Sequence, residues 1–275
     1  MTDEPAAGQP GAAPLSGPGG AQLPAAPTTT APAAVPAPAA IPAPAAGPAP
    51  VAPRVTAPRS GPGLLVAVSL WRLALAGCAL YGFGAAMTGD YTGAVNWRNL
   101  GYFSQWGSLL VGVVALGGLL SPLWNHGAYE GRRGVLRGLA VTCTTLIAIV
   151  FGTLLGADYS STASLFEHLV TPIVALIDWL AVGRNAARVQ WWWPAGYLVV
   201  VLAYLPTYLA TSEAFGHPLY GFLDPDADDF WVWVVALLAG FGVLALVLLA
   251  AARLTRRWLQ ADRPPGAQPA FAGGR

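Results

Sequence analysis

The chain has 275 residues, of which 55% are hydrophobic and only 10% are charged. Soluble domains carry about 25% charged residues, and the mean hydropathy of this chain is positive, at +0.53. These values exclude an ordinary soluble globular protein and indicate a polytopic membrane protein. The 14 basic residues are all arginines and face 13 acidic ones, so we expect no concentrated basic surface and no nucleic-acid partner.

Only two cysteines and three histidines are present as candidate metal ligands. Cys78 and Cys143 lie inside apolar runs, with neither the short spacing of a metal-binding pair nor a disulfide framework. The three histidines, at positions 126, 168 and 217, are split between the two predicted faces of the membrane. Because a metal needs several such side chains to converge, we predict no metal and no cofactor.

The first 60 residues differ sharply from the rest. They contain 15 of the 25 prolines and no aromatic residue. A segment without large apolar side chains cannot offset the entropy of its own ordering, so residues 1–60 are expected to form a disordered Pro/Ala-rich arm. Residues 259–275 are expected to form a disordered cytoplasmic tail. The folded domain is therefore predicted to span residues 61–258.

Six apolar stretches between these tails are long enough to cross a bilayer. Each has 18 to 23 residues, which at about 1.5 Å of rise per residue matches a hydrocarbon core of about 30 Å. Tryptophans gather near their ends, as is typical of the membrane–water interface. We predict an all-α, polytopic bundle of six transmembrane helices at residues 64–86, 103–123, 135–156, 166–183, 192–210 and 230–252.

Arginines predict the orientation of this bundle. The N-terminal arm, the second and fourth loops and the C-terminal segment carry nearly all of them, whereas the opposite side has only Arg98. Because positively charged loops stay in the cytoplasm, both termini are expected there, in a multi-pass protein of the plasma membrane. The outward loops are acidic instead, at Asp90, Asp158, Glu213, Asp224, Asp226, Asp228 and Asp229.

Two charged residues fall inside predicted spans, where charge is costly and marks a candidate site. Arg72 lies in the first span and Asp178 in the fourth, which runs in the opposite direction. Counted from the cytoplasmic side at about 1.5 Å per residue, their depths differ by only a few Å. We therefore predict a structural ion pair between Arg72 and Asp178. The alternative is that Arg72 extends alone to the cytoplasmic headgroups.

A hydroxyl and an imidazole share one depth near the outer face. Ser104 is the second residue of the second span and His168 the third residue of the fourth, and both spans begin outside. An imidazole that accepts the hydroxyl proton is the minimal set for nucleophilic ester cleavage. The alternative is an interfacial histidine and a helix N-terminal serine. The neighbouring Glu167 is interpreted as part of a capping box with Ser164, not as a partner of the dyad.

The longest outward loop, residues 211–229, adds candidate binding residues. Its stretch from Tyr220 to Asp224 places two aromatic side chains and an acid beside the proposed dyad. An apolar lid over a lipid-facing cleft has this composition, and so does an ordinary interfacial loop. The later Asp226, Asp228 and Asp229 suit the positive N-terminal dipole of the sixth span.

Several of these residues resemble the androgen-induced membrane protein family. The similarity covers residues 64–252 and rests on Tyr102-Phe103-Ser104, on His168 ten residues before Asp178, and on Tyr220-Gly221-Phe222-Leu223-Asp224. Eukaryotic members are six-span hydrolases of fatty acid esters of hydroxy fatty acids, and this chain would be a bacterial relative. The resemblance implies catalysis by Ser104, in place of the family's threonine, and by His168, with Tyr220, Phe222 and Asp224 near the substrate.

Two departures from the family pattern leave other functions open. Gly221 replaces a proline, and Trp106-Gly107-Ser108 stands where bacterial relatives have a Gln-Ser-Asn run. The alternatives to a lipid esterase are a non-catalytic lipid-binding or accessory protein and a small transporter. The expected partners are membrane lipids and a fatty-acid ester substrate, while the oligomeric state stays open.

Overall fold

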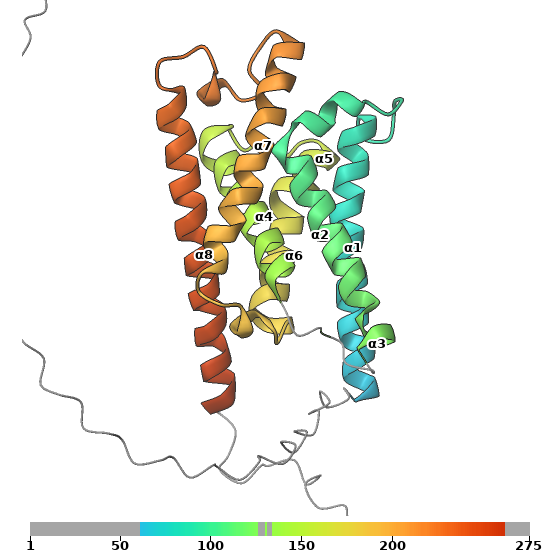
Figure 1. The fold of residues 1–275 in the computed structure, drawn as a ribbon. Coiled ribbons are helices and arrows are strands. Elements are labelled where there is room, and N and C mark those ends of the chain that lie inside the picture. The colour runs from blue at the N-terminus through green and yellow to red at the C-terminus, as the bar shows by residue number, and fades with distance from the viewer. Residues whose placement is uncertain (1–60, 126–129, 131–133, 262–275) are drawn as a thin grey trace, which may run out of the picture. The chain divides into compact units, whose positions relative to one another are not determined.

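The computed structural model describes residues 61–125, 130 and 134–261. These residues form an all-α fold, as predicted (Figure 1). The expected arm at residues 1–60 lies outside the described residues, as do residues 262–275 of the expected tail. Helix α8 continues to Ala261, so the first three residues of that expected tail are helical.

Five helical segments have the length and apolar composition of membrane spans, as expected of a polytopic membrane protein. They are Pro62–Thr88 (α1), Val135–Leu154 (α4), Thr162–Val182, Trp193–Phe215 (α7) and Phe230–Trp258, which belongs to α8 (Phe230–Ala261). The remaining expected span, 103–123, is divided into α2 (Phe103–Leu119) and α3 (Ser121–Trp124). Pro122 cannot donate to the α2 backbone, so α2 ends after 17 residues.

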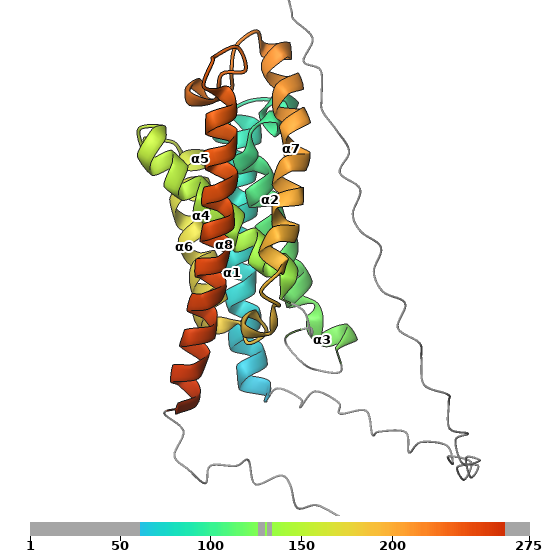
Figure 2. The same cartoon turned by 60° about the vertical axis from the view of Figure 1, so that its left-hand side comes forward.

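The long helices pack in two pairs around a central helix. Helices α1 and α2 lie side by side, as do α7 and α8 on the other side of α4 (Figures 1 and 2). The start of α1, α3, η4 (Ala186–Arg188) and the end of α8 lie at one end, which also holds Arg137, Arg184 and Arg253; we call it the arginine end. The opposite end, with η1 (Trp97–Gly101) and residues 216–229, is called the acidic end.

The segment Thr162–Val182 is one helix with two widened turns. It consists of α5 (Thr162–Leu165), α6 (Thr171–Ile177) and two π-helical turns, η2 (Phe166–Val170) and η3 (Asp178–Val182). In η2 the Thr171 N–H donates to the Phe166 carbonyl, five residues earlier. Pro172 accounts for this widening, because it has no N–H and its ring would clash with the carbonyl of His168 in a regular helix.

The N-terminus of this segment corrects one sequence-based interpretation. Ser161 is the N-cap, and its hydroxyl accepts a hydrogen bond from the Ser164 N–H at 3.0 Å. The expected capping box of Ser164 and Glu167 is therefore wrong. Because the helix begins four residues before the expected position 166, Glu167 lies beyond the first turn and its carboxyl group is available for tertiary contacts. Similarly, α7 continues to Phe215, which shortens the expected loop 211–229 to 216–229.

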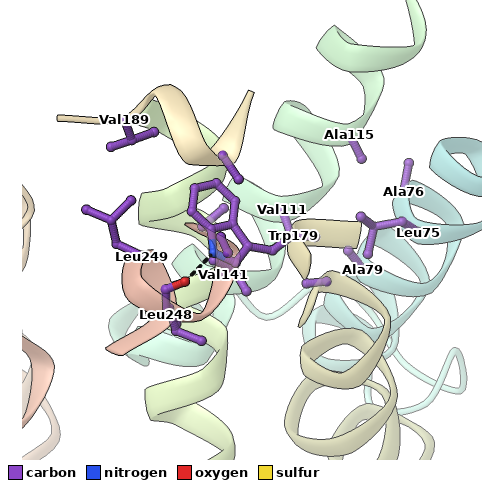
Figure 3. Close-up of a cluster of buried hydrophobic side chains, with 14 residues drawn as sticks. Leu75, Ala76, Ala79, Val111, Ala115, Val141, Trp179, Val189, Leu248 and Leu249 are labelled. Carbon is purple, nitrogen blue, oxygen red and sulfur yellow. Dashed lines mark hydrogen bonds between the residues drawn. The ribbon is translucent and has the colours of Figure 1, made fainter. Parts of the chain in front are cut away.

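The core at the arginine end is built from small residues around one tryptophan. Trp179 of η3 is 2% exposed and packs among side chains from α1, α2, α4, η4 and α8 (Figure 3). Its indole N–H donates to the Leu248 carbonyl of α8 at 3.0 Å. Alanines from α1 and α2, such as Ala79 and Ala115, let those helices approach closely. Small residues at helix contacts are typical of membrane bundles.

The outward faces of the helices carry large apolar side chains that no described element covers. Examples are Val66 and Leu70 of α1, Ile149 of α4 and Val235 of α8, all between 47% and 63% exposed. In water such a surface would favour aggregation. In a bilayer it contacts lipid, which agrees with the spans that length and composition indicate.

Candidate functional site

A cavity of about 460 Å³ lies near the acidic end, among α2, α4, η2, α7, α8 and the segment 219–223. Most of its lining is aliphatic or aromatic, including Leu146, Val150, Leu205 and Leu238. Polar side chains also line it, from the first turn of α2 and from η2. A cavity of this volume, with mostly apolar walls and a few polar side chains, is typical of a site for a small molecule.

The structure places both proposed dyad residues in the lining of this cavity. Ser104 comes from the first turn of α2 and His168 from η2. The His168 ring stacks on Phe151, with 3.9 Å between ring centroids and 13° between planes. Its Nδ1 lies 3.1 Å from the Ser164 carbonyl oxygen. Because a carbonyl only accepts, Nδ1 carries the proton and the neutral ring keeps a basic Nε2. No hydrogen bond joins Ser104 to His168.

A buried carboxyl group lies directly beside the dyad. The Gln105 amide donates to Glu167 Oε2 at 2.8 Å, and the two residues are 3% and 2% exposed. Ser104 and Ser108 lie near the same carboxyl group, one helical turn apart on α2. Neither hydroxyl makes a regular hydrogen bond to Glu167 Oε1, and Gln105 Oε1 also has no partner among the described residues. Gly82 of α1 gives Glu167 its space, because a Cβ there would lie 3.1 Å from Glu167 Cγ.

Tyr220 holds the segment 219–223 against α2 and α7, where this segment lines the cavity. Its hydroxyl accepts the Phe103 N–H at 3.0 Å, which satisfies an unpaired donor at the start of α2. Its ring stacks on Tyr208 of α7 at 5.9 Å and 5°. Burial raises the pKa of Tyr220 to about 12, so the phenol keeps its proton at neutral pH. The Tyr208 hydroxyl donates to the Leu223 carbonyl, which closes the same segment onto α7.

Of the other two candidate binding residues, one lines the cavity and one does not. Phe222 is in the lining and contacts Trp233 of α8 edge-on, with 5.4 Å between ring centroids. Asp224 is outside the lining, and its carboxylate accepts the Asp226 N–H at 3.0 Å. Asp224 therefore shapes the turn after η5 (Gly221–Leu223), which is a common role of aspartate.

The charged residues inside the spans form a cluster with different pairing from that expected. Asp178 is bound by Arg137, whose Nη2 lies 2.6 Å from Asp178 Oδ2. Arg137 also contacts Glu130 at 2.7 Å, and Arg72 contacts the same Glu130 oxygen at 3.2 Å. The expected direct pair of Arg72 and Asp178 is therefore replaced by a chain of four, which we call the ionic cluster: Arg72, Glu130, Arg137 and Asp178.

Backbone groups complete the ionic cluster. Arg72 Nη1 donates to the Gly118 carbonyl at 2.8 Å. That carbonyl is four residues before Pro122, which has no N–H to bind it, so Arg72 satisfies an acceptor that the proline leaves open. Glu130 Oε2 accepts the N–H groups of Arg184 and Asn185, at 2.7 and 2.8 Å. The cluster thus joins α1, α2, α4, η3 and the second and fourth loops.

Two groups of residues were missed at the sequence level, for different reasons. Gln105 and Glu167 occupy the third position of α2 and the first turn of the expected fourth span, so the depth count that placed Ser104 beside His168 could have paired them. Glu130 lies in a loop, where a depth count gives no position. Arg137, at the start of the predicted third span, looks in the sequence like one more of the arginines that predict the orientation.

Comparison with known proteins gives no further guidance. No protein-family model, curated protein or solved structure matches the chain. Within residues 61–125, 130 and 134–261, no group of three or more His, Cys, Asp or Glu side chains could hold a metal ion. The function of the protein is therefore inferred from the cavity and the residues that line it.

Proposed function

We propose that this protein is an integral membrane hydrolase of lipid esters, related to the androgen-induced membrane protein family, and that Ser104 and His168 are its catalytic residues. The observation that supports the proposal is that these two side chains, 64 positions apart in the sequence, line one apolar cavity. Tyr220 and Phe222 line the same cavity and would contact the bound lipid. The resemblance to the family contributes the type of reaction.

The chemistry follows from the histidine tautomer. His168 Nδ1 donates to the Ser164 carbonyl, which leaves Nε2 as the base. His168 would take the Ser104 proton as the oxygen attacks the ester carbonyl, and would return it to the departing alcohol. Water, activated by the same nitrogen, would then release the acid and regenerate Ser104. Catalytic hydrogen bonds are commonly longer in ligand-free sites than in complexes, so the hydroxyl and the imidazole would meet when substrate is bound.

The location of the cavity agrees with this reaction. It lies near the acidic end, so a lipid held among the helices would have its ester close to water. We propose that α2, although it has only 17 residues, also crosses the membrane and brings the number of spans to six. We also propose that the arginine end faces the cytoplasm. In this orientation the cavity would open toward the outer leaflet of the plasma membrane.

A fluorophosphonate probe and an ester assay test the proposal. Labelling of purified protein should be lost in Ser104→Ala, and ester turnover should fall by about 10² to 10⁴ in Ser104→Ala and His168→Ala alike. The double variant should be no slower than either single one, because the two residues act as a unit. Ser160→Ala and His217→Ala are matched controls, since both residues are exposed at the acidic end and outside the cavity lining.

A non-catalytic lipid-binding protein is the second candidate. It is favoured by the apolar lining and by the lack of a hydrogen bond between Ser104 and His168. Absence of both labelling and turnover, with lipid still bound by the purified protein, would reject the hydrolase and support this second candidate. Small, additive losses of turnover would mean that the two residues shape a binding site without being the catalytic unit.

A further inference from the structure

Arg188, Arg253 and Arg257 lie at one corner of the arginine end, where the last turns of α8 meet η4. Arg253 Nη2 donates to the Val189 carbonyl at 2.7 Å, and Arg188 is the residue before Val189. Arg257 follows Arg253 by about one helical turn, so both lie on the same face of α8. The hydrogen bond therefore holds α8 beside η4, and we call Arg188, Arg253 and Arg257 the basic corner.

The basic corner has no acidic partner in the part of the chain that the structure describes. Glu130 and Asp178, the described acidic residues at this end, already bind Arg72 and Arg137 in the ionic cluster. No ion pair joins a residue of the basic corner to another described residue. A guanidinium has several N–H donors, and the bond from Arg253 to Val189 uses only one of its own. The basic corner thus has both the charge and the donors to bind an anion.

The length of α8 places the basic corner at the level of the lipid head groups. Helix α8 has 32 residues, which at about 1.5 Å of rise per residue is about 48 Å, whereas a hydrocarbon core is about 30 Å thick. A core of that thickness takes about 20 residues, and the same count from Trp233, near the opposite interface, reaches Arg253. The last turns of α8 extend beyond η4 (Figure 1). Arg253 and Arg257 therefore lie where the hydrocarbon ends.

Exposed indole rings stand next to these arginines in the chain. Trp191 and Trp192 come shortly after Arg188, and Trp258 comes directly after Arg257. The three rings are between 46% and 73% exposed. Exposed tryptophans of this kind settle at the membrane–water interface, with the ring against lipid and the N–H toward polar groups. They favour a membrane lipid over a soluble anion, which would leave these rings without a contact.

The charge of the basic corner selects among phospholipids. Guanidinium groups bind phosphate oxygens through paired, charge-assisted hydrogen bonds. A zwitterionic head group would also bring an ammonium or a quaternary ammonium beside the arginines. The described carboxylates at this end are held in the ionic cluster, so that second cation would be repelled without a counter-charge. A head group with a net negative charge avoids this cost.

We propose that Arg188, Arg253 and Arg257 bind the head group of an anionic phospholipid in the leaflet at the arginine end. Trp191 and Trp258 would contact its glycerol and the upper part of its acyl chains. The basic corner lies at the opposite end of the bundle from the cavity. This site is therefore independent of the proposed function, and loss of ester turnover would say nothing about it.

Equilibrium binding to the full-length protein in detergent micelles tests the proposal. The probes are fluorescent phosphatidylglycerol and fluorescent phosphatidylcholine with identical acyl chains, which differ in head-group charge. We expect phosphatidylglycerol to bind about tenfold tighter. An excess of inorganic phosphate should leave this binding unchanged. Equal affinity for the two lipids would overturn the proposal, and displacement of phosphatidylglycerol by inorganic phosphate would make the site one for a soluble anion.

Single variants locate the effect at the basic corner. Arg188→Gln and Arg257→Gln, both at exposed positions, leave the bond from Arg253 to Val189 in place. Each should weaken phosphatidylglycerol binding about fivefold. Phosphatidylcholine binding should not change, which also reports that the variants are folded.

Arg98→Gln is the matched control, because it removes one exposed arginine from the acidic end. It should leave the affinity for phosphatidylglycerol unchanged. An equal loss in Arg98→Gln would assign the preference to the overall charge of the protein and overturn the proposal. A preference that persists undiminished in both Arg188→Gln and Arg257→Gln would overturn it as well.

Discussion

Replacing Arg137 with methionine tests the pairing within the ionic cluster. The Arg137 side chain is 12% exposed and makes the only side-chain hydrogen bonds that Asp178 receives among the described residues, at 2.6 and 3.1 Å. Methionine keeps most of the apolar stem and leaves the Asp178 carboxylate buried without a partner. Breaking a buried ion pair in this way costs roughly 3–5 kcal/mol. In a chain of this size that corresponds to a fall in Tm of about 10 °C.

A double-mutant cycle separates this pairing from the one that span depth suggested. Coupling between Arg137→Met and Asp178→Leu should be about 2–3 kcal/mol, because the double variant no longer buries an unpaired charge. Coupling between Arg72→Met and Asp178→Leu should stay below about 1 kcal/mol, since Arg72 contacts Glu130 and the Gly118 carbonyl instead.

Unfolding of the purified protein in detergent, followed by tryptophan fluorescence, measures both cycles. Arg188→Met is a suitable control, because Arg188 is exposed at the same end of the bundle, and its effect should lie within about 0.5 kcal/mol. A large coupling for Arg72 with Asp178, together with additive losses for Arg137 with Asp178, would refute the pairing described above.

Two more predictions concern packing and orientation. Gly82→Ala should lower the free energy of unfolding by about 1–3 kcal/mol, because the new Cβ would lie 2.9 Å from Phe166 Cβ. Gly77→Ala in the same helix is the control, since its Cβ meets nothing within 4 Å and the change should be neutral or stabilising. Thermal unfolding of the two variants measures the difference. A cytoplasmic reporter fused after Arg275 should be active and a periplasmic reporter inactive, because the arginine end is expected inside the cell; activity of the periplasmic reporter alone would reverse the orientation.

The sequence was sufficient for the features that depend on long apolar runs. Runs of about 20 apolar residues predict membrane spans because the bilayer sets their length, and five of the six expected spans have long apolar helices. The remaining run was interrupted by Pro122, whose effect depends on which neighbour can satisfy the freed carbonyl. That neighbour is Arg72, from another helix, and no local pattern predicts such a contact.

The site was predictable only where span depth decides which residues meet. Counting from the outer face brought Ser104 and His168 to one level, and both line the same cavity. The same count placed Arg72 and Asp178 at one level, but their partners are Glu130 and Arg137. Depth gives the position of a residue along the membrane normal. Whether two residues at one depth meet also depends on the face of the helix that carries each of them. Glu130 had no predictable position at all, because it comes from a loop.

Pro172 connects the local chain to the chemistry of the cavity. Its missing N–H and bulky ring prevent the regular hydrogen bond to His168, four residues earlier, and the turn widens so that Thr171 bonds to Phe166. This widened turn carries two consecutive polar residues, Glu167 and His168, and both line the cavity. Each then has a partner that fixes it, the Gln105 amide for the carboxyl group and the Ser164 carbonyl for the imidazole. A proline in an apolar span thus stands beside the turn that brings a carboxyl group and an imidazole to the same cavity.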